Sequence, residues 1–318
     1  MGNGFRGANG QPAASPYTNG PYNFSEDITF QGTVNAVGNG GTIYYVDSSL
    51  SASNGGGSWA DAFITIAEAV AASLAAGGTY DTIFVRGNEI DETSDYAESV
   101  TVTAAQVGLR IIGMGNSPEG VLWTVGTAEG TILNVAAKDF YVSGFRFRPN
   151  GATSGKAVDL AVTALGSTIE NCIFRSTTET ALYGIYLEST PDVTIRDCKF
   201  TSIATAIYGN AAVKTVYRLR VLDCDFDDKV DTAGINISGR ACVIKRNTFT
   251  TDTTLLIDTR KGGTGEMNTV NGNTLMCGTS YAVNCVGAAS DCWIGNDCNK
   301  LSEGTETDAS GRTIKIPA

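Results

Sequence analysis

The chain has 318 residues, a formal net charge of −11 and no histidine. This excess of negative charge argues against a nucleic-acid partner and against adhesion to an anionic membrane, because both surfaces attract basic patches. No run approaches the ~20 apolar residues of a membrane span, and the absence of histidine excludes Ser–His–Asp and Cys–His catalytic devices.

Residues 1–35 predict an extended arm that anchors the chain on a partner. Residues 1–24 are rich in glycine, asparagine and proline, so they cannot form a core of their own. No apolar segment of about 15 residues with a basic flank opens the chain, so we expect no signal peptide and synthesis in a host cytoplasm. The side chains expected to dock on another protein are Phe5, Arg6, Tyr17, Tyr22 and Phe24.

Residues 36–80 predict a strand, a loop and a capping helix. Thr65 and Glu68 form the pattern of a capping box, and Gly77 with Gly78 ends the helix. Ile66, Val70 and Leu74 recur at a spacing of four, so we expect them to share one buried face. Such a helix would cover the open backbone edge of the element that follows.

Residues 81–301 carry a repeat that organises the chain. Its template is an apolar residue, two spacers, a small residue of the buried type, one spacer and an aromatic residue, as in 195–200. A second pair of alternating apolar residues precedes most copies, which indicates short strands with one buried face. A period of 23 to 27 residues indicates a solenoid whose coils each contain three short strands. The copies start at Val142, Ile169, Ile195, Val221, Ile244, Val270 and Trp293.

Stacking such coils places equivalent residues about 4.8 Å apart, so that each position forms a column of side chains. Two of these columns stand out. The phenylalanines predict a buried aromatic stack. Asparagine accepts the left-handed backbone of a tight corner, and its amide can bond to the next coil. The second column reads Cys172, Cys198, Cys224, Asn247, Asn273 and Asn296.

An asparagine ladder at a corner, followed by an apolar strand, resembles the pectin-lyase-like right-handed parallel β-helix superfamily. The resemblance covers about residues 40–300 and implies an all-β solenoid with three short strands per coil. Lyases, hydrolases, adhesins and viral spikes share this fold, so the resemblance leaves the function open. Residues 302–318 predict a tail in which 313–316 pairs as a last strand or covers the open end.

The cysteines predict free thiols rather than disulfides. Three of the eight cysteines occupy one column, where parallel side chains suit a disulfide poorly. Paired CxxC units and histidine ligands are both absent, so we expect no metal and no cofactor.

Enzymes of the resembled superfamily work on the outer face of one sheet, usually with carboxylates. Asp159 and Glu188 would lie on adjacent coils at about 8 Å, within the ~6.5–9.5 Å of an inverting glycosidase pair. The alternative is that both residues are solvated surface carboxylates with no catalytic role. Tyr186 and Tyr208 are candidates for stacking on sugar rings. The predicted outward column reads Asp159, Tyr186, Tyr208, Asn236, Leu256 and Asn284, with Asp258 two residues beyond Leu256.

Two groups of charged residues are predicted to lie on another outer face of the solenoid. Acidic residues are densest at Asp223, Asp225, Asp227 and Asp228. Asp225 would neighbour Lys199 of the preceding coil, so a cross-strand ion pair accounts for its placement. Arg146, Arg148 and Arg175 share that face and would either meet an anionic sugar or only increase solubility.

Three functions remain open from the sequence. The N-terminal arm resembles leaders of bacteriophage head and tail appendages, and this resemblance implies a structural virion protein, a spike, fibre or capsid decoration. On that hypothesis the chain is a homotrimer without enzymatic activity, located in the virion and bound to other virion proteins through the arm, and it contacts host surface polysaccharide. The alternatives are a polysaccharide depolymerase, acting as a lyase or hydrolase, and a passive glycan-binding module.

Overall fold

The computed structural model describes most of the chain beyond residue 40. Contacts divide the chain into residues 1–36 and 37–318, and every described residue belongs to the second unit. The anchoring arm, including Phe5, Arg6, Tyr17, Tyr22 and Phe24, therefore lies outside the described residues. The described ranges are 41–87, 96–115, 120–125, 130–150, 154–176, 182–209, 215–227, 229–250, 255–261, 266–276, 285–298, 306–307 and 313–314.

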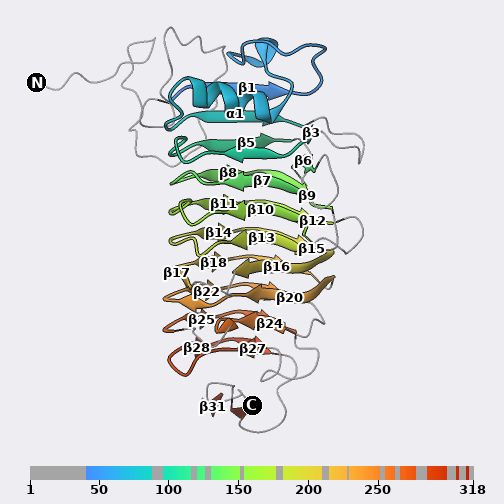
Figure 1. Ribbon diagram of the computed structural model, residues 1–318. Helices are drawn as coiled ribbons and strands as arrows, with labels where there is room; N and C mark the ends of the chain where they lie inside the picture. The colour runs from blue at the N-terminus through green and yellow to red at the C-terminus, as the bar shows by residue number, and fades with distance from the viewer. Residues whose placement is uncertain are drawn as a thin grey trace, which may run out of the picture. The chain divides into compact units, whose positions relative to one another are not determined.

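In these residues, short parallel strands form three long sheets (Figure 1). The ten-stranded sheet contains β1 (Ile43–Asp47), β2 (Thr82–Arg86), β5 (Arg110–Met114), β8 (Tyr141–Ser143), β11 (Thr168–Glu170), β14 (Thr194–Arg196), β18 (Arg220–Leu222), β22 (Val243–Lys245), β25 (Thr269–Asn271) and β28 (Cys292–Ile294). The nine-stranded sheet contains β3 (Tyr96–Ala97), β6 (Val121–Thr124), β9 (Phe145–Arg148), β12 (Ile173–Arg175), β15 (Lys199–Thr201), β19 (Asp225–Phe226), β23 (Thr248–Phe249), β26 (Thr274–Leu275) and β29 (Asp297–Cys298). The eight-stranded sheet contains β4 (Val100–Val102), β7 (Thr131–Val135), β10 (Lys156–Leu160), β13 (Tyr183–Leu187), β16 (Ile203–Gly209), β20 (Val230–Asn236), β24 (Leu255–Asp258) and β27 (Cys285–Val286).

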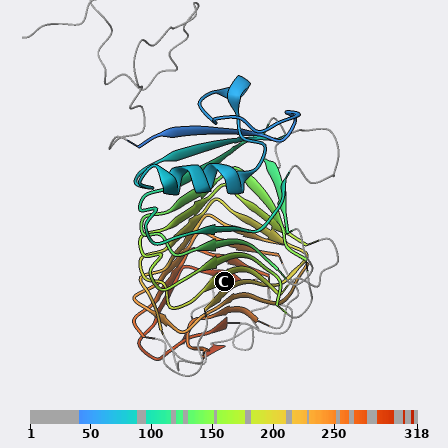
Figure 2. The same cartoon turned by 45° about the horizontal axis from the view of Figure 1, so that its top comes forward.

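Each complete coil contributes one strand to each sheet, which confirms the parallel β-helix expected from the repeat. Strands β11, β12 and β13 make one such coil, and the next coil stacks on it in register (Figures 1 and 2). Ile169 pairs with Ile195, and Phe174 pairs with Phe200. The template positions are therefore structurally equivalent from coil to coil. Two small pairs lie outside the long sheets: β17 (Val216–Tyr217) with β21 (Gly239–Arg240), and β30 (Glu306–Thr307) with β31 (Thr313–Ile314).

The phenylalanine column forms the predicted buried stack. Neighbouring ring centroids lie 4.3 to 5.3 Å apart with interplanar angles of 4 to 14°. All five rings are completely buried. Burying one such side chain stabilises a fold by roughly 1.5–3 kcal/mol, so this column is a main source of coil cohesion. Its members are Phe147, Phe174, Phe200, Phe226 and Phe249.

The corner between the ten- and nine-stranded sheets is built from left-handed residues and a buried ladder. Asn247 Nδ2 donates to Val221 O at 3.0 Å, and Asn247 Oδ1 accepts from the Cys224 amide at 2.9 Å. In earlier coils a thiol takes this place, and Cys198 Sγ donates to Arg196 O at 3.2 Å. The ladder cysteines are free and buried, which confirms the prediction made for them. The left-handed corner residues are Gly144, Asn171, Asp197, Asp223, Arg246, Gly272 and Gly295. The expectation that the ladder asparagines adopt this conformation was wrong, because the residue before each of them makes the turn.

Helix α1 (Ile66–Ala75) lies across the first coil (Figure 2). The predicted capping box is present, because the Thr65 hydroxyl accepts from the Glu68 amide and Glu68 accepts from the Thr65 amide. The expected buried face was wrong at its end, because Leu74 is 42% exposed and Ser73 is buried in its place. The 3₁₀ helix η1 (Trp59–Asp61) precedes α1. Among the described residues, no helix is both long and apolar enough to span a membrane.

Candidate functional site

The outward column of the eight-stranded sheet differs from the prediction at one coil. Asp159, Tyr186, Tyr208 and Asn236 are in register as expected, but Asp258 rather than Leu256 pairs with Asn236. Leu256 is completely buried. The reason is that these strands bury two successive residues, as at Gly184–Ile185 and Leu256–Ile257, so strict alternation fails. The predicted Asn284 lies outside the described residues.

Three tyrosines and two lysines gather on this face. Tyr186 and Tyr208 stack with ring centroids 5.4 Å apart, and the Tyr183 ring lies 4.4 Å from that of Tyr208. The Lys156 ammonium lies 3.7 Å from the Tyr186 ring centroid, and the Lys261 ammonium lies 3.2 Å from that of Tyr208. We call these five residues the tyrosine–lysine surface.

The order of the strands places the two lysines on opposite sides of the stacked tyrosines. Lys156 is on β10, which precedes the tyrosine strands β13 and β16, and Lys261 follows β24, which lies beyond them. Tyr186 and Tyr208 therefore present each ring face to a ring or an ammonium. Such contacts are cation–π attractions that hold the ammonium groups in place on an outer face. The expected stacking of a sugar on these rings would require the lysines to move.

Two tyrosines of this surface, Tyr183 and Tyr186, have raised pKa values. Burial, followed by the charge and hydrogen bond of Tyr208, raises the pKa of Tyr183 to about 12. Burial raises the pKa of Tyr186 as well, and the nearby Asp159 and Glu188 carboxylates add to the increase. Neutral phenols on this face can donate hydrogen bonds to a ligand, but they are poor bases.

The predicted carboxylates lie beside the tyrosines. Asp159 Oδ2 lies 2.6 Å from Lys156 Nζ, so an ion pair accounts for this residue. Glu188 follows β13 on the adjacent coil and is exposed. Burial raises the pKa of Asp258, against the lowering effects of the Arg260 amide and of the Arg260 and Lys261 charges. Asp258 is four strands from Asp159, about 19 Å at ~4.8 Å per strand, so these two cannot form a glycosidase pair.

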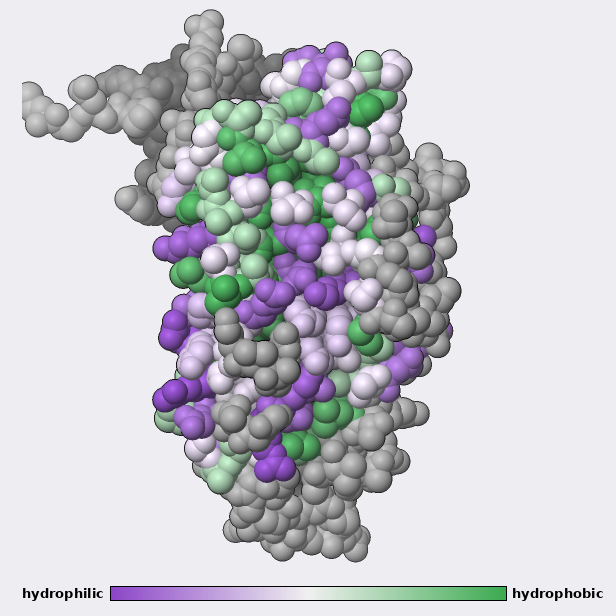
Figure 3. Space-filling view, in the orientation of Figure 1, coloured by the Kyte–Doolittle hydropathy of each residue, from purple (hydrophilic) through white to green (hydrophobic). Residues whose placement is uncertain are grey.

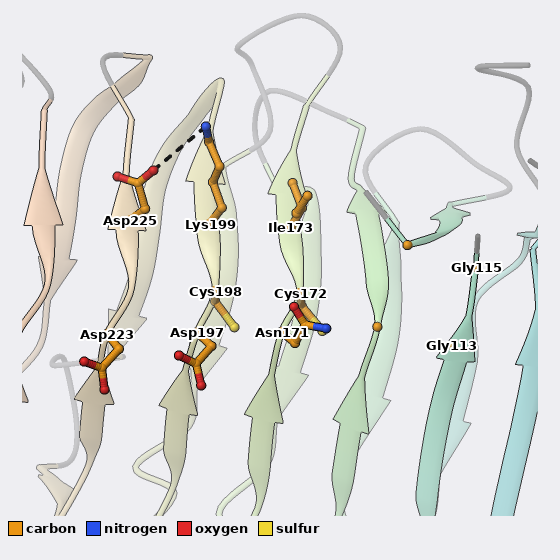
Figure 4. Close-up of a pocket in the computed structure, with 12 residues that line it drawn as sticks. Gly113, Gly115, Asn171, Cys172, Ile173, Asp197, Cys198, Lys199, Asp223 and Asp225 are labelled. Atoms are coloured by element: carbon orange, nitrogen blue, oxygen red, sulfur yellow. Dashed lines mark ion pairs between the residues drawn. The ribbon is translucent and has the colours of Figure 1, made fainter. Parts of the chain in front are cut away.

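A hollow of about 480 Å³ lies at the corner between the ten- and nine-stranded sheets (Figure 4). We call it the corner groove. Its lining comprises a glycine floor (Gly113, Gly115, Gly120 and Gly144), a corner row (Asn171, Asp197 and Asp223), an outer row (Ile173, Lys199 and Asp225), and Cys172 and Cys198 beneath.

Ion pairs fix much of the charge in the corner groove. Lys199 Nζ lies 3.9 Å from Asp225 and 3.1 Å from Asp227, which confirms the predicted cross-strand pair. The Arg246 guanidinium binds Asp223 through two bonds of 2.6 Å and lowers the pKa of that carboxyl. Burial raises the pKa of Asp225, although the Lys199 ammonium opposes the change. Asp228 lies outside the described residues.

The predicted arginines divide between two columns of the nine-stranded sheet. Arg146 pairs with Ile173, and Arg175 pairs with Thr201 one position further along. Arg175 lines a second hollow of about 260 Å³ that shares Ile173 and Lys199 with the corner groove. Within the described part of the chain, no group of three or more Cys, Asp or Glu side chains is placed to hold a metal ion.

Sequence reasoning missed the two lysines of the tyrosine–lysine surface. Lys156 is three residues before Asp159, so its place on the same strand was a usable signal. Lys261 had no such signal, because it belongs to an insertion between coils whose path no repeat position defines. Sequence reasoning also missed the corner groove. This hollow forms where glycines leave a column without side chains, and the repeat was read from the side chains that are present.

Comparisons with known proteins agree on the fold. The family described as "Right handed beta helix region" matches residues 120–298. A pectin methylesterase from carrot superposes with a TM-score of 0.54 and 14% identity, covering 90% of this chain and 91% of that one. An alginate lyase from Paenibacillus sp. str. FPU-7 superposes with a TM-score of 0.52 and 14% identity, covering 73% of this chain and 93% of that one. No curated protein matches the sequence.

Proposed function

Because the chain belongs to the right-handed β-helix family, we propose that it binds a polysaccharide along the outer face of its eight-stranded sheet. The observation that carries this proposal is the tyrosine–lysine surface. Its phenols and ammonium groups are hydrogen-bond donors fixed by mutual contacts rather than free to move. Donors already held in place lose less conformational entropy when a ligand binds.

The proposed ligand carries carboxylate groups. Two ammonium groups, Lys156 and Lys261, flank the tyrosines and suit charge-assisted bonds to anionic sugars. Lys156 also pairs with Asp159 at 2.6 Å, but an ammonium group has three N–H donors. The names of the two structurally similar enzymes give pectin and alginate as their polysaccharides, which supports the same class of ligand. At 14% identity, however, the similarity concerns the fold, and the ligand class rests on the surface itself.

We propose binding without cleavage. Asp159 is already engaged by Lys156 at 2.6 Å, and the phenols of Tyr183 and Tyr186 have raised pKa values that make them poor bases. Asp159 with Glu188 is the second candidate, an acid pair for glycoside hydrolysis, because both carboxylates lie close enough to Tyr186 to raise its pKa. This alternative would require ligand binding to displace Lys156.

The virion hypothesis stays a prediction. Its main support was the arm of residues 1–35, which lies outside the described residues, and neither the family match nor the solved structures bear on it. A glycan-binding face is compatible with a particle component that contacts a host surface. Homotrimer formation and binding to virion proteins through Phe5, Arg6, Tyr17, Tyr22 and Phe24 are likewise untested predictions.

The test is calorimetric titration of the full chain with alginate and pectin, with uncharged dextran as a control. Changing Lys156 or Lys261 to Gln should weaken binding roughly tenfold each, because each change removes one charge-assisted bond. Lys138→Gln is the matched control, since this lysine is exposed at a turn and, among the described residues, its ion pair is with its neighbour Asp139 at 3.7 Å. Equal affinities for all three variants, or no binding of either polymer, would overturn the proposal.

Cleavage is measured in the same samples by the appearance of new chain ends. We expect none. If chain ends appear and Asp159→Asn or Glu188→Gln abolishes them, the chain is a depolymerase and the passive reading is wrong.

A further inference from the structure

The corner groove lies on different sheets from the tyrosine–lysine surface and shares no residue with it. It is therefore a second candidate site, independent of the proposed function.

The hollow exists because backbones approach each other closely where side chains would otherwise fill the corner. A Cβ atom on Gly144 would lie 2.3 Å from the carbonyl oxygen of Gly113, and one on Gly113 would lie 2.3 Å from that of Gly144. Such distances exclude any side chain at either position. The groove consequently has a floor of bare backbone, with free space above it and larger side chains only on the following coils.

Two parallel rows of side chains face this space (Figure 4). The corner row presents the amide of Asn171 and the carboxylates of Asp197 and Asp223 on successive coils. The outer row presents the apolar side chain of Ile173, then Lys199 and Asp225. Hydrogen-bonding groups beside one apolar side chain, in a polar hollow, suit a polyhydroxylated ligand.

Most charges of the corner groove are already paired. Arg246 neutralises Asp223, and Lys199 lies between Asp225 and Asp227. Asp197 is exposed and makes no ion pair with any residue that the structure describes, although the Arg196 and Arg246 guanidinium groups lie near enough to interact with its charge. A ligand with a positive charge would supply Asp197 with an ion-pair partner.

We propose that the corner groove binds an oligosaccharide that carries a protonated amine. The ammonium group pairs with Asp197, the hydroxyl groups bond to Asn171, Lys199 and Asp225, and the apolar face of a sugar ring lies on Ile173. The chain then has two saccharide sites of opposite preference, one for acidic sugars and one for amino sugars.

The test is titration of the full chain with a glucosamine tetramer and with its fully N-acetylated form. The tetramer should bind, and acetylation should weaken binding roughly tenfold or more, because it removes the charge that pairs with Asp197. Asp197→Asn should have the same effect on the free amine. Asp139→Asn is the matched control, since both residues are aspartates in the left-handed region, at φ 56° and 53°, which asparagine also adopts.

Three results would overturn the inference: no binding of the tetramer, equal binding of both forms, or equal losses in the two aspartate variants. Spermidine displacing the tetramer at the same concentration would show that charge alone is recognised, which contradicts a saccharide site. Lys156→Gln with Lys261→Gln should leave tetramer binding intact. Failure of this site is thus distinguishable from failure of alginate or pectin binding.

Discussion

Replacing Asn247 by alanine should test whether the corner ladder holds neighbouring coils together. The side chain is 1% exposed and makes three hydrogen bonds, to Cys224 N, Val221 O and Asn273 Oδ1, at 2.9 to 3.0 Å. Its removal leaves the buried Cys224 amide without an acceptor, at a cost of about 1–3 kcal/mol, and removes a donor from Val221 O at about 1 kcal/mol more. We therefore expect a loss of about 2–4 kcal/mol in the free energy of unfolding.

The assay is urea denaturation followed by circular dichroism, with Asn271→Ala as the matched control. Asn271 lies on the outer face at the end of β25, so its replacement should change stability by no more than about 0.5 kcal/mol. Asn247→Cys should fall between the two, because a thiol can still donate to a carbonyl, as Cys198 does, but is a weak acceptor. Equal stability of Asn247→Ala and Asn271→Ala would refute the ladder as a source of cohesion.

Two further predictions concern the aromatic side chains. Phe200→Ala should lower the free energy of unfolding by about 3–5 kcal/mol in the same urea assay, since the ring is completely buried with neighbouring ring centroids at 4.8 and 5.0 Å. A loss below about 1 kcal/mol would show that the stack closes over the gap. Tyr183 has a pKa of about 12 in the folded chain, whereas an unfolded tyrosine loses its proton near pH 10. The contribution of Tyr183 to the free energy of unfolding should therefore fall as the pH rises from about 10 to about 12. A spectrophotometric titration should show a phase of phenolate absorbance near pH 12 that Tyr183→Phe removes. If all phenolate absorbance appeared near pH 10, the raised pKa would be contradicted.

The interior of the coils was predictable from the sequence because each buried position repeats. Phe174, Phe200 and Phe226 stack in the way that their spacing requires. The cysteines and asparagines of the ladder share one column for the same reason. A buried column tolerates few residue types, so the pattern survives from coil to coil and can be read directly.

The outer face was less predictable because nothing obliges its residues to repeat. Leu256 was assigned outward by strict alternation, whereas its strand buries two successive residues and turns Asp258 outward. Lys261 reaches Tyr208 from an insertion that no repeat position defines. Tyr186 and Tyr208 were expected on adjacent coils, but as platforms for a sugar ring, so neither their stacking on each other nor the lysines that cover the stack were anticipated.

This separation between inside and outside explains how one chain can carry the two proposed sites. Stability comes mainly from the buried columns, so residues such as Lys156 and Asp197 can differ from one coil to the next without disturbing the stack. Because each outer residue has neighbours about 4.8 Å away on the adjacent coils, an outer charge can pair across coils. Asp223 and Asp225 pair in this way, whereas Asp197 makes no ion pair with any described residue.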